Sequence, residues 1–148
     1  MNTILVVEDD ADIRRNLVEF LEMEGYRTLT ATNGQEALDL LSRIPELPRA
    51  IVLDLAMPVM DGCEFRKRQR NDPRLAPIPV VLVSAVNDIE PKRVELGRIT
   101  FLRKPIDIDE LARVLREAIT DRAEVPVVSM KRGANSQEPP PSVDARRL

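Results

Sequence analysis

The chain has 148 residues, 43% of them hydrophobic, and a formal net charge of −3, so it can bury one core and lacks the basic excess that favours nucleic acid or an anionic membrane. It contains no histidine, which excludes Ser-His-Asp and Cys-His catalysis, histidine zinc sites and a histidine phosphate carrier. Its one cysteine cannot form an internal disulfide, no apolar run approaches the ~20 residues of a membrane span, and no signal peptide precedes Glu8, so we expect a cytoplasmic protein.

Short apolar runs alternate with amphipathic stretches along the chain. Runs of β-branched and aliphatic residues predict strands, and apolar residues that repeat at helical spacing predict helices. In chain order the expected elements are a strand at Thr3 to Val7, a helix at Asp12 to Glu24, a strand at Tyr26 to Ala31, a helix from Asn33-Gly34 to Pro45, a strand at Ile51 to Asp54, a helix at Gly62 to about Arg70, a strand at Ile78 to Val83, a short helix within Ile89 to Leu96, a strand at Thr100 to Arg103 and a helix at Asp107 to Ile119.

This alternation predicts an α/β fold. Strands joined by helices favour a doubly wound, five-stranded parallel sheet in the order 2-1-3-4-5, flavodoxin-like, with helices on both faces. We assign residues 1–122 to this domain. From Ala123 onward the helical periodicity stops, and Pro126 and the run Pro139 to Pro141 appear. Residues 123–148 are therefore predicted to form a mostly disordered, proline-containing tail.

The stretch around Asp54 organises the rest of the chain. Ile51 to Leu53 form an apolar run without polar alternation, typical of a strand buried on both faces of a parallel sheet. Asp54 comes where this strand runs out, and Pro58 and Asp61-Gly62 mark a loop. Ligand chemistry gathers at the carboxyl ends of strands in such sheets, so Asp54 is placed where an acid can act. Taken alone, it could also be an acid that only caps a turn.

Three further pieces of the chain are predicted to end at the same edge of the sheet. Glu8 and Asp9 follow the first strand, Ser84 follows the fourth, and Lys104 follows the fifth. Crowded carboxylates repel each other, and a divalent cation would relieve that repulsion. Oxygen ligands without histidine favour Mg²⁺ over zinc. Such a site suits phosphoryl transfer to a carboxylate, with Lys104 paired with Asp54 at rest and Ser84 available to donate to a phosphoryl oxygen.

Together these motifs resemble the receiver domain of two-component response regulators. The resemblance rests on Ile4 to Asp10, Asp54 to Gly62, Ser84-Ala85 and Phe101 to Pro105, in this order and at the family's spacing. By position it implies that Asp54 is the phosphoacceptor, that Glu8, Asp9, Asp54 and the Ala56 backbone carbonyl hold Mg²⁺, that Ser84 and Lys104 act in catalysis, that Ser84 and Phe101 form the switch, and that the Lys104-Pro105 peptide bond is cis.

The resemblance also implies partners and an activity. We expect Asp54 to take a phosphoryl group from the phosphohistidine of a sensor histidine kinase or a histidine phosphotransfer protein. The domain would then change the surface that binds a downstream protein target. The chain is not expected to be an enzyme beyond its own phosphorylation and slow dephosphorylation. The segment after Ile119 has no room for a DNA-binding module, so we predict a stand-alone regulator or phosphorelay shuttle without direct DNA or membrane binding, and a homodimer stays open.

Three alternatives remain open from the sequence. The chain could be a phosphate-independent interaction module on a receiver fold, although its intact set of site residues argues against this. It could be the receiver fragment of a hybrid kinase, although Met1 directly precedes the first strand. A Mg²⁺-dependent phosphatase of the haloacid dehalogenase type would need a second acid two residues after its nucleophile, where this chain has Ala56.

Two features depart from the family pattern. The interval from Ser84 to Gly97 is short and contains Pro91, so the fourth helix is expected to be short or irregular, which puts the usual signalling surface in doubt. Arg66 and Gln69 stand in the third helix where apolar residues are common, which predicts shallow packing or a covering partner. We interpret the basic second half of this helix as a solvated face, with a partner-binding face as the alternative.

Overall fold

A five-stranded, all-parallel sheet forms the centre of the computed structural model, which describes residues 2–85, 96–97 and 99–132, with residues 121–132 described by backbone alone. The strand order is β2-β1-β3-β4-β5, which confirms the predicted topology. Asp54 lies in register with Val83, and Ser84 with Arg103, so the carboxyl ends of neighbouring strands meet at one edge. The strands are β1 (Thr3–Val7), β2 (Arg27–Ala31), β3 (Ala50–Asp54), β4 (Val80–Ser84) and β5 (Thr100–Arg103).

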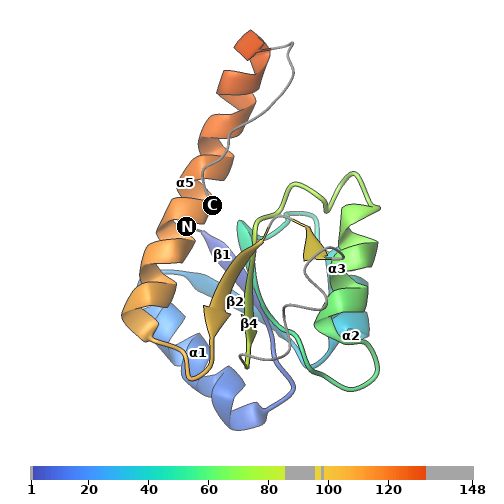
Figure 1. The fold of residues 1–148 in the computed structure, drawn as a ribbon, viewed down its shortest axis with the longest axis vertical. Coiled ribbons are helices and arrows are strands. Elements are labelled where there is room, and N and C mark those ends of the chain that lie inside the picture. The colour runs from blue at the N-terminus through green and yellow to red at the C-terminus, as the bar shows by residue number, and fades with distance from the viewer. Residues whose placement is uncertain (1, 86–95, 98, 133–148) are drawn as a thin grey trace.

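The described helices cover both faces of the sheet. Helices α1 (Ala11–Met23) and α5 (Ile108–Arg132) pack on one face, and α2 (Gly34–Arg43) and α3 (Gly62–Arg70) pack on the other (Figure 1). Within the described residues, no helix is long and apolar enough to cross a membrane. The sheet therefore separates two apolar cores, as expected for a doubly wound domain.

Alternate residues of each strand feed these two cores, because successive side chains of a strand point to opposite faces. Leu5 and Val7 join the core under α2 and α3, whereas Ile4 and Val6 join the core under α1 and α5. Strand β3 is buried along its whole length, which agrees with its unbroken apolar run. The central strands are thus held from both sides, and the loops at their carboxyl ends start from fixed points.

A polar side chain caps the N-terminus of each of the helices α1, α2 and α3. The carboxylate of Asp10 accepts from the backbone of α1, that of Asp61 accepts from α3, and the amide oxygen of Asn33 accepts from α2. Each cap satisfies backbone N–H groups that have no partner inside the helix. These caps fix where the loops end and the helices start.

The predicted elements that fall on described residues agree with the structure except at some boundaries. Strands β1 and β5 and helix α3 have the predicted bounds, whereas β4 begins at Val80, after a proline that cannot donate to a neighbouring strand. The short helix predicted within Ile89 to Leu96 falls mostly on residues 86–95, outside the described residues.

The prediction that the last helix ends at Ile119 was wrong, because α5 runs to Arg132 and its second half extends beyond the sheet (Figure 1). A proline inside a helix removes one backbone hydrogen bond, but it does not always end the helix, and Pro126 lies inside α5. Residues 123–132 of the predicted tail are thus helical, and residues 133–148 lie outside the described residues. The division of the chain into a domain and a tail stays a prediction.

Candidate functional site

The acidic side chains predicted to meet at the sheet edge do come together. Glu8, Asp9 and Asp54 each place one carboxylate oxygen within 4.8 Å of the others. Glu8 follows β1 and Asp54 ends β3, and these two strands are hydrogen-bonded neighbours. Glu8 and Asp54 are buried, with 3% and 4% of their surface exposed, whereas Asp9 is exposed. The cluster is therefore a half-open acidic site with two carboxylates that water reaches poorly.

Burial and the neighbouring charges of this site change the pKa of Glu8. Burial is the main cause that raises the pKa of Glu8 from 4.5 to about 7, and the nearby charge of Asp54 raises this pKa further, while Lys104 and a backbone N–H oppose the change. In the absence of a cation, burying two acids side by side thus favours the protonated form of one of them. A positive ion bound between them would reverse that preference.

Lys104 is the cation that faces the cluster from β5. Its Nζ lies 3.2 Å from Asp54 Oδ1 and 3.8 Å from Glu8 Oε1, and its side chain is 31% exposed. The Lys104 backbone N–H also donates to the Ser84 carbonyl at 2.9 Å, which continues the β4–β5 ladder to the edge. Ser84 itself is buried, with 2% of its surface exposed. The pairing of Lys104 with Asp54 is the resting arrangement that the sequence predicted.

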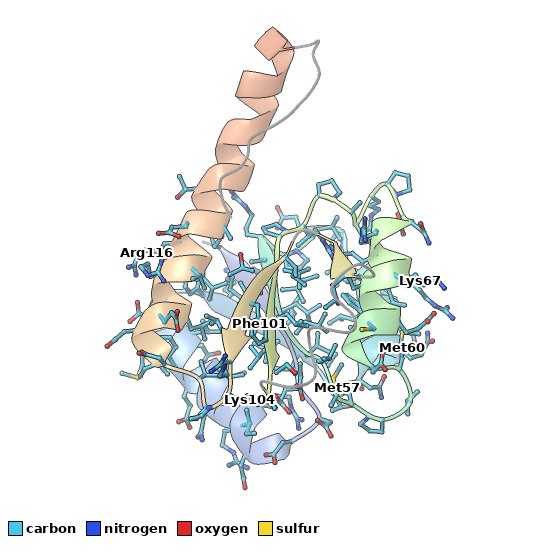
Figure 2. The ribbon with its side chains drawn as sticks, viewed as in Figure 1. Met57, Met60, Lys67, Phe101, Lys104 and Arg116 are labelled. Carbon is cyan, nitrogen blue, oxygen red and sulfur yellow. The ribbon has the colours of Figure 1, made fainter. Side chains whose placement is uncertain are left out.

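The remaining predicted site residues lie around this centre. Phe101 sits on β5, in register with Leu82 of β4, and packs partly buried against the core under α2 and α3. Figure 2 shows Phe101 along the strand and Lys104 at its carboxyl end. The Lys104–Pro105 peptide bond is cis. Ala56 is exposed in the loop that follows β3, one residue beyond the buried Leu55.

The loop between β3 and α3 is held tightly against the Asp54 backbone. A Cβ at Gly62 would lie 2.7 Å from the Asp54 carbonyl oxygen, so glycine is required for this close approach. The Gly62 N–H donates to the Leu55 carbonyl at 2.7 Å. In the same loop, Met60 N–H donates to the Pro58 carbonyl at 2.7 Å across Val59, whose φ of 68° is rarely adopted by a β-branched residue.

A second contact ties the same loop to α2. The Gly34 N–H donates to the Met60 carbonyl at 2.9 Å, and a Cβ at Gly34 would lie 2.8 Å from the Met60 side chain. Figure 2 shows Met57 and Met60 in this loop, with Met57 at the same end of the sheet as Lys104. The loop that carries Ala56 is therefore anchored at both ends.

Arg14, which the sequence analysis did not single out, anchors the loop between β1 and α1. Its Nη1 donates to the Glu8 carbonyl at 2.8 Å and lies 3.4 Å from the Asp9 carbonyl. The signal for it in the sequence is weak: an arginine one helical turn after Asp10, which caps α1. One carboxylate oxygen of Glu8 accepts from the Asp10 N–H at 3.1 Å, which fixes the orientation of that side chain.

The prediction for Arg66 and Gln69 was wrong, because both are buried in the structure, with 7% and 0% of their surface exposed. Arg66 Nε donates to the Leu96 carbonyl at 2.9 Å, and Arg66 Nη1 donates to Gln69 Oε1 at 2.8 Å. Gln69 Nε2 in turn donates to the carbonyls of Leu75 and Ile78 at 3.0 and 2.9 Å. Helix α3 thus packs closely, with Arg66 and Gln69 held by hydrogen bonds in addition to the apolar contacts of the buried Phe65.

The charge of Arg66 is retained inside the protein. Burial is the main cause that lowers the pKa of Arg66 from 12.5 to about 10, and the nearby charge of Arg70 lowers it further. Lys67, Arg68 and Arg70 are exposed, so the solvated face predicted for the basic half of α3 holds for these three residues. Figure 2 shows Lys67 on the side of α3 that points away from the sheet.

The residues at the sheet edge fit a hard divalent cation. Three carboxylates within 4.8 Å of one another provide only oxygen ligands, which Mg²⁺ prefers, and a cation bound among them would offset the repulsion between their charges. Among the described residues, this is the group of acids close enough to share an ion. Glu8, Asp9 and Asp54 are therefore the residues that would hold Mg²⁺.

The comparisons with known proteins agree on one family. The family model of the response regulator receiver domain matches residues 4–116. Sporulation initiation phosphotransferase F from Bacillus subtilis is 36% identical over 116 residues, which cover 77% of this chain and 90% of that protein. The match to the family model spans the site residues from Glu8 to Lys104.

Solved structures show the same fold. The receiver domain of a signal transduction histidine kinase from Syntrophus aciditrophicus aligns with a TM-score of 0.76 and 29% identity over 93% of this chain and 98% of that one. The receiver domain of a sensor histidine kinase from Pseudomonas aeruginosa aligns with a TM-score of 0.72 and 27% identity over 80% of this chain and 98% of that one. The latter structure has a magnesium ion coordinated in its active-site cleft.

Proposed function

The chain belongs to the response regulator receiver domain family, and from this premise we propose that Asp54 accepts a phosphoryl group from a partner's phosphohistidine in a Mg²⁺-dependent step. One observation carries the proposal: the Asp54 carboxylate is buried beside two further acids and 3.2 Å from the Lys104 ammonium. This arrangement gives a carboxylate nucleophile, oxygen ligands for a hard cation and a positive group for phosphoryl oxygens.

The transfer itself needs little more than positioning and charge. A carboxylate oxygen of Asp54 attacks phosphorus, the bond between phosphorus and the donor nitrogen breaks, and the imidazole of the donor keeps the electron pair. When bound by Glu8, Asp9 and Asp54, with the Ala56 carbonyl as a further predicted ligand, Mg²⁺ supplies positive charge that offsets the charge on the phosphoryl oxygens. The pair of Lys104 with Asp54 then gives way to a pair of Lys104 with a phosphoryl oxygen.

The switch follows from the new charge at Asp54. A phosphoryl group adds about −1.5 to −2 charges at this buried position. Ser84, which ends the neighbouring strand, would donate its hydroxyl to a phosphoryl oxygen. Movement of Ser84 changes the space next to β5, where Phe101 packs partly buried, and Phe101 would rotate into that space. Differential contacts of this kind are what shift a two-state equilibrium.

The comparisons also support a class of partner. Receiver domains take phosphoryl groups from histidine kinases, and the similarity to a sporulation phosphotransferase over nearly its whole length supports a stand-alone regulator or a phosphorelay shuttle. We propose a sensor histidine kinase or a histidine phosphotransfer protein as the donor and a protein as the downstream target. The chain would catalyse its own phosphorylation and slow dephosphorylation and would turn over no external substrate.

Intact-mass spectrometry after incubation with acetyl phosphate tests the proposal. We expect a gain of one phosphoryl group that requires Mg²⁺, and we expect Asp54→Asn, folded as judged by circular dichroism, to show none. Lys104→Met serves as a second variant, expected to bind Mg²⁺ and to label more slowly because the ammonium beside Asp54 is gone. If the wild-type protein binds Mg²⁺ but neither acetyl phosphate nor a phosphorylated histidine phosphotransfer protein labels it, the phosphoacceptor role is refuted and a phosphate-independent interaction module is favoured.

A further inference from the structure

The loop that carries Glu8 and Asp9 is held by hydrogen bonds at each of its residues. The Glu8 N–H donates to the Ala31 carbonyl at 3.0 Å, which extends the β1–β2 ladder by one residue. The Asp10 N–H donates to Glu8 Oε2, and the Asp10 carboxylate caps α1. Arg14 satisfies the two remaining carbonyl groups of Glu8 and Asp9 from one guanidinium nitrogen, at 2.8 and 3.4 Å.

Arg14 therefore acts on the two residues that project their carboxylates toward Asp54. It binds the backbone of these residues, while their side chains belong to the acidic cluster. A cation that binds carbonyl groups makes hydrogen bonds of the stronger, charge-assisted kind. Outer groups that orient metal ligands in this way commonly change metal affinity by 10- to 100-fold when they are removed.

We propose that Arg14 is a positioning residue that fixes the Glu8–Asp9 backbone so that both carboxylates meet Asp54 in a divalent-cation site. The inference rests on the proposed function only in that it takes Mg²⁺ as the ion of this site. Arg14 is half-buried, and its guanidinium reaches from the first turns of α1 to the end of β1. Without it, the carbonyls of Glu8 and Asp9 lose a fixed partner and the loop can take other conformations.

The neighbouring residue provides a matched control. Arg15 lies on the same helix, is exposed, and pairs with Asp12 at 3.0 Å instead of with the loop. Arg14→Gln and Arg15→Gln remove the same charge from adjacent positions. A general loss of positive charge near the acids would affect the two variants alike, whereas loss of the carbonyl contacts would affect only the first.

The direct measurement is the dissociation constant of Mg²⁺ alone, obtained by calorimetric or NMR titration of the full chain at fixed ionic strength. We expect Arg14→Gln to weaken Mg²⁺ binding about tenfold, at the lower end of the range for such outer groups, and Arg15→Gln to weaken it less than twofold. Arg14→Lys, which keeps a cation and one donor group, should recover part of the affinity. Circular dichroism and metal-free thermal unfolding establish which variants fold.

A second readout separates positioning from direct participation in the chemistry. The labelling rate of Arg14→Gln with acetyl phosphate should be low at limiting Mg²⁺ and close to that of the wild type at saturating Mg²⁺. A rate that stays low at saturating Mg²⁺ would show a role in the reaction itself and would overturn the positioning role.

Two results of the titration would also overturn the inference. Wild-type affinity in a folded Arg14→Gln variant, or equal weakening in the Arg14→Gln and Arg15→Gln variants, removes the basis for a positioning role while leaving the phosphoacceptor role of Asp54 intact. Wild-type protein that binds no Mg²⁺ would refute this inference together with the metal part of the proposed function. Loss of labelling in the wild type with normal Mg²⁺ binding would refute only the phosphoacceptor role.

Discussion

Replacing Glu8 with glutamine should remove a pH-dependent loss of stability from the metal-free protein. Glu8 is 3% exposed, and burial next to Asp54 raises its pKa from 4.5 to about 7. Glutamine has nearly the same shape and carries no charge at any pH. The comparison between the two proteins therefore isolates the free energy associated with ionising this one buried acid.

The sign follows from the direction of the pKa shift. Below pH 4.5 both the folded and the unfolded wild type carry the proton, so the Glu8 contribution to stability is fully present. As the pH rises from 4.5 towards 7, the unfolded state releases the proton first, and the free energy of unfolding falls. One pKa unit corresponds to about 1.4 kcal/mol, so the shift from 4.5 to about 7 amounts to roughly 3 kcal/mol, lost by neutral pH.

Urea unfolding of wild type and Glu8→Gln from pH 4 to 8, in the presence of a chelator, measures this difference. No histidine obscures the window, because the chain contains none, and the other carboxylates titrate in both proteins. The wild type should lose roughly 3 kcal/mol relative to the variant between pH 4.5 and 7. Adding Mg²⁺ at pH 8 should stabilise the wild type much more than the variant, because the ion binds the ionised carboxylate.

A constant difference between wild type and Glu8→Gln across this pH range would refute the reasoning. It would mean that the Glu8 carboxyl has the same pKa in the folded and the unfolded protein, because the Lys104 ammonium, 3.8 Å away, offsets the cost of burial. Equal stabilisation of both proteins by Mg²⁺ would show that Glu8 is not a ligand of the ion.

Three further predictions concern the loop between β3 and α3 and helix α3 itself. Val59→Gly should raise the free energy of unfolding by about 0.5 to 1 kcal/mol, measured by urea unfolding, because Val59 has φ 68° and is 83% exposed. Gly62→Ala should destabilise by about 1 to 3 kcal/mol and lower acetyl phosphate labelling, measured by unfolding and intact mass, because its Cβ would lie 2.7 Å from the Asp54 carbonyl. Arg66→Leu should cost about 3 kcal/mol in urea unfolding, because the buried Gln69 loses a donor.

Two of these predictions have a control variant, and each of the three can be contradicted by a stated result. Val59→Ala keeps the strain of a side chain at positive φ and should not match the gain from glycine. Val59→Gly destabilising the protein would contradict the strain argument, and normal labelling by a fully stable Gly62→Ala would contradict the close approach. Arg68→Leu removes an exposed arginine of the same helix, 55% exposed and paired with Glu64, and should cost less than about 0.5 kcal/mol. Equal costs for the two arginines would refute the buried network.

The sheet and the acids at its edge could be predicted from the sequence because local patterns specify both. An unbroken apolar run such as Ile51 to Leu53 identifies a central strand, and parallel topology then places Asp54 beside the acids after β1. Strand β4 separates β5 from β3, and the long side chain of Lys104 reaches past the end of β4 to Asp54. Register and pleat leave few other positions for side chains that directly follow neighbouring strands.

The contacts that could not be predicted are hydrogen bonds from a side chain of one helix to the backbone of another segment. Arg66 donates to the Leu96 carbonyl, which lies 30 residues further along the chain, and no periodic pattern encodes that contact. A polar residue among the apolar positions of a helix can be exposed to solvent or can be buried with its hydrogen bonds made, and the sequence does not distinguish the two. The hydrogen bonds of Arg14 to the loop before α1 were missed for the same reason.

The hydrogen bonds through Arg66 and Gln69 make these two positions depend on each other, so that neither residue can be exchanged independently. An exchange of either residue alone leaves the other without one of its buried hydrogen-bond partners, and exchanging both for apolar residues also removes the donors to the backbone carbonyls of Leu75, Ile78 and Leu96. The two residues should therefore be kept together. Anyone transplanting α3 into another receiver must move both residues and the backbone turns whose carbonyls receive them.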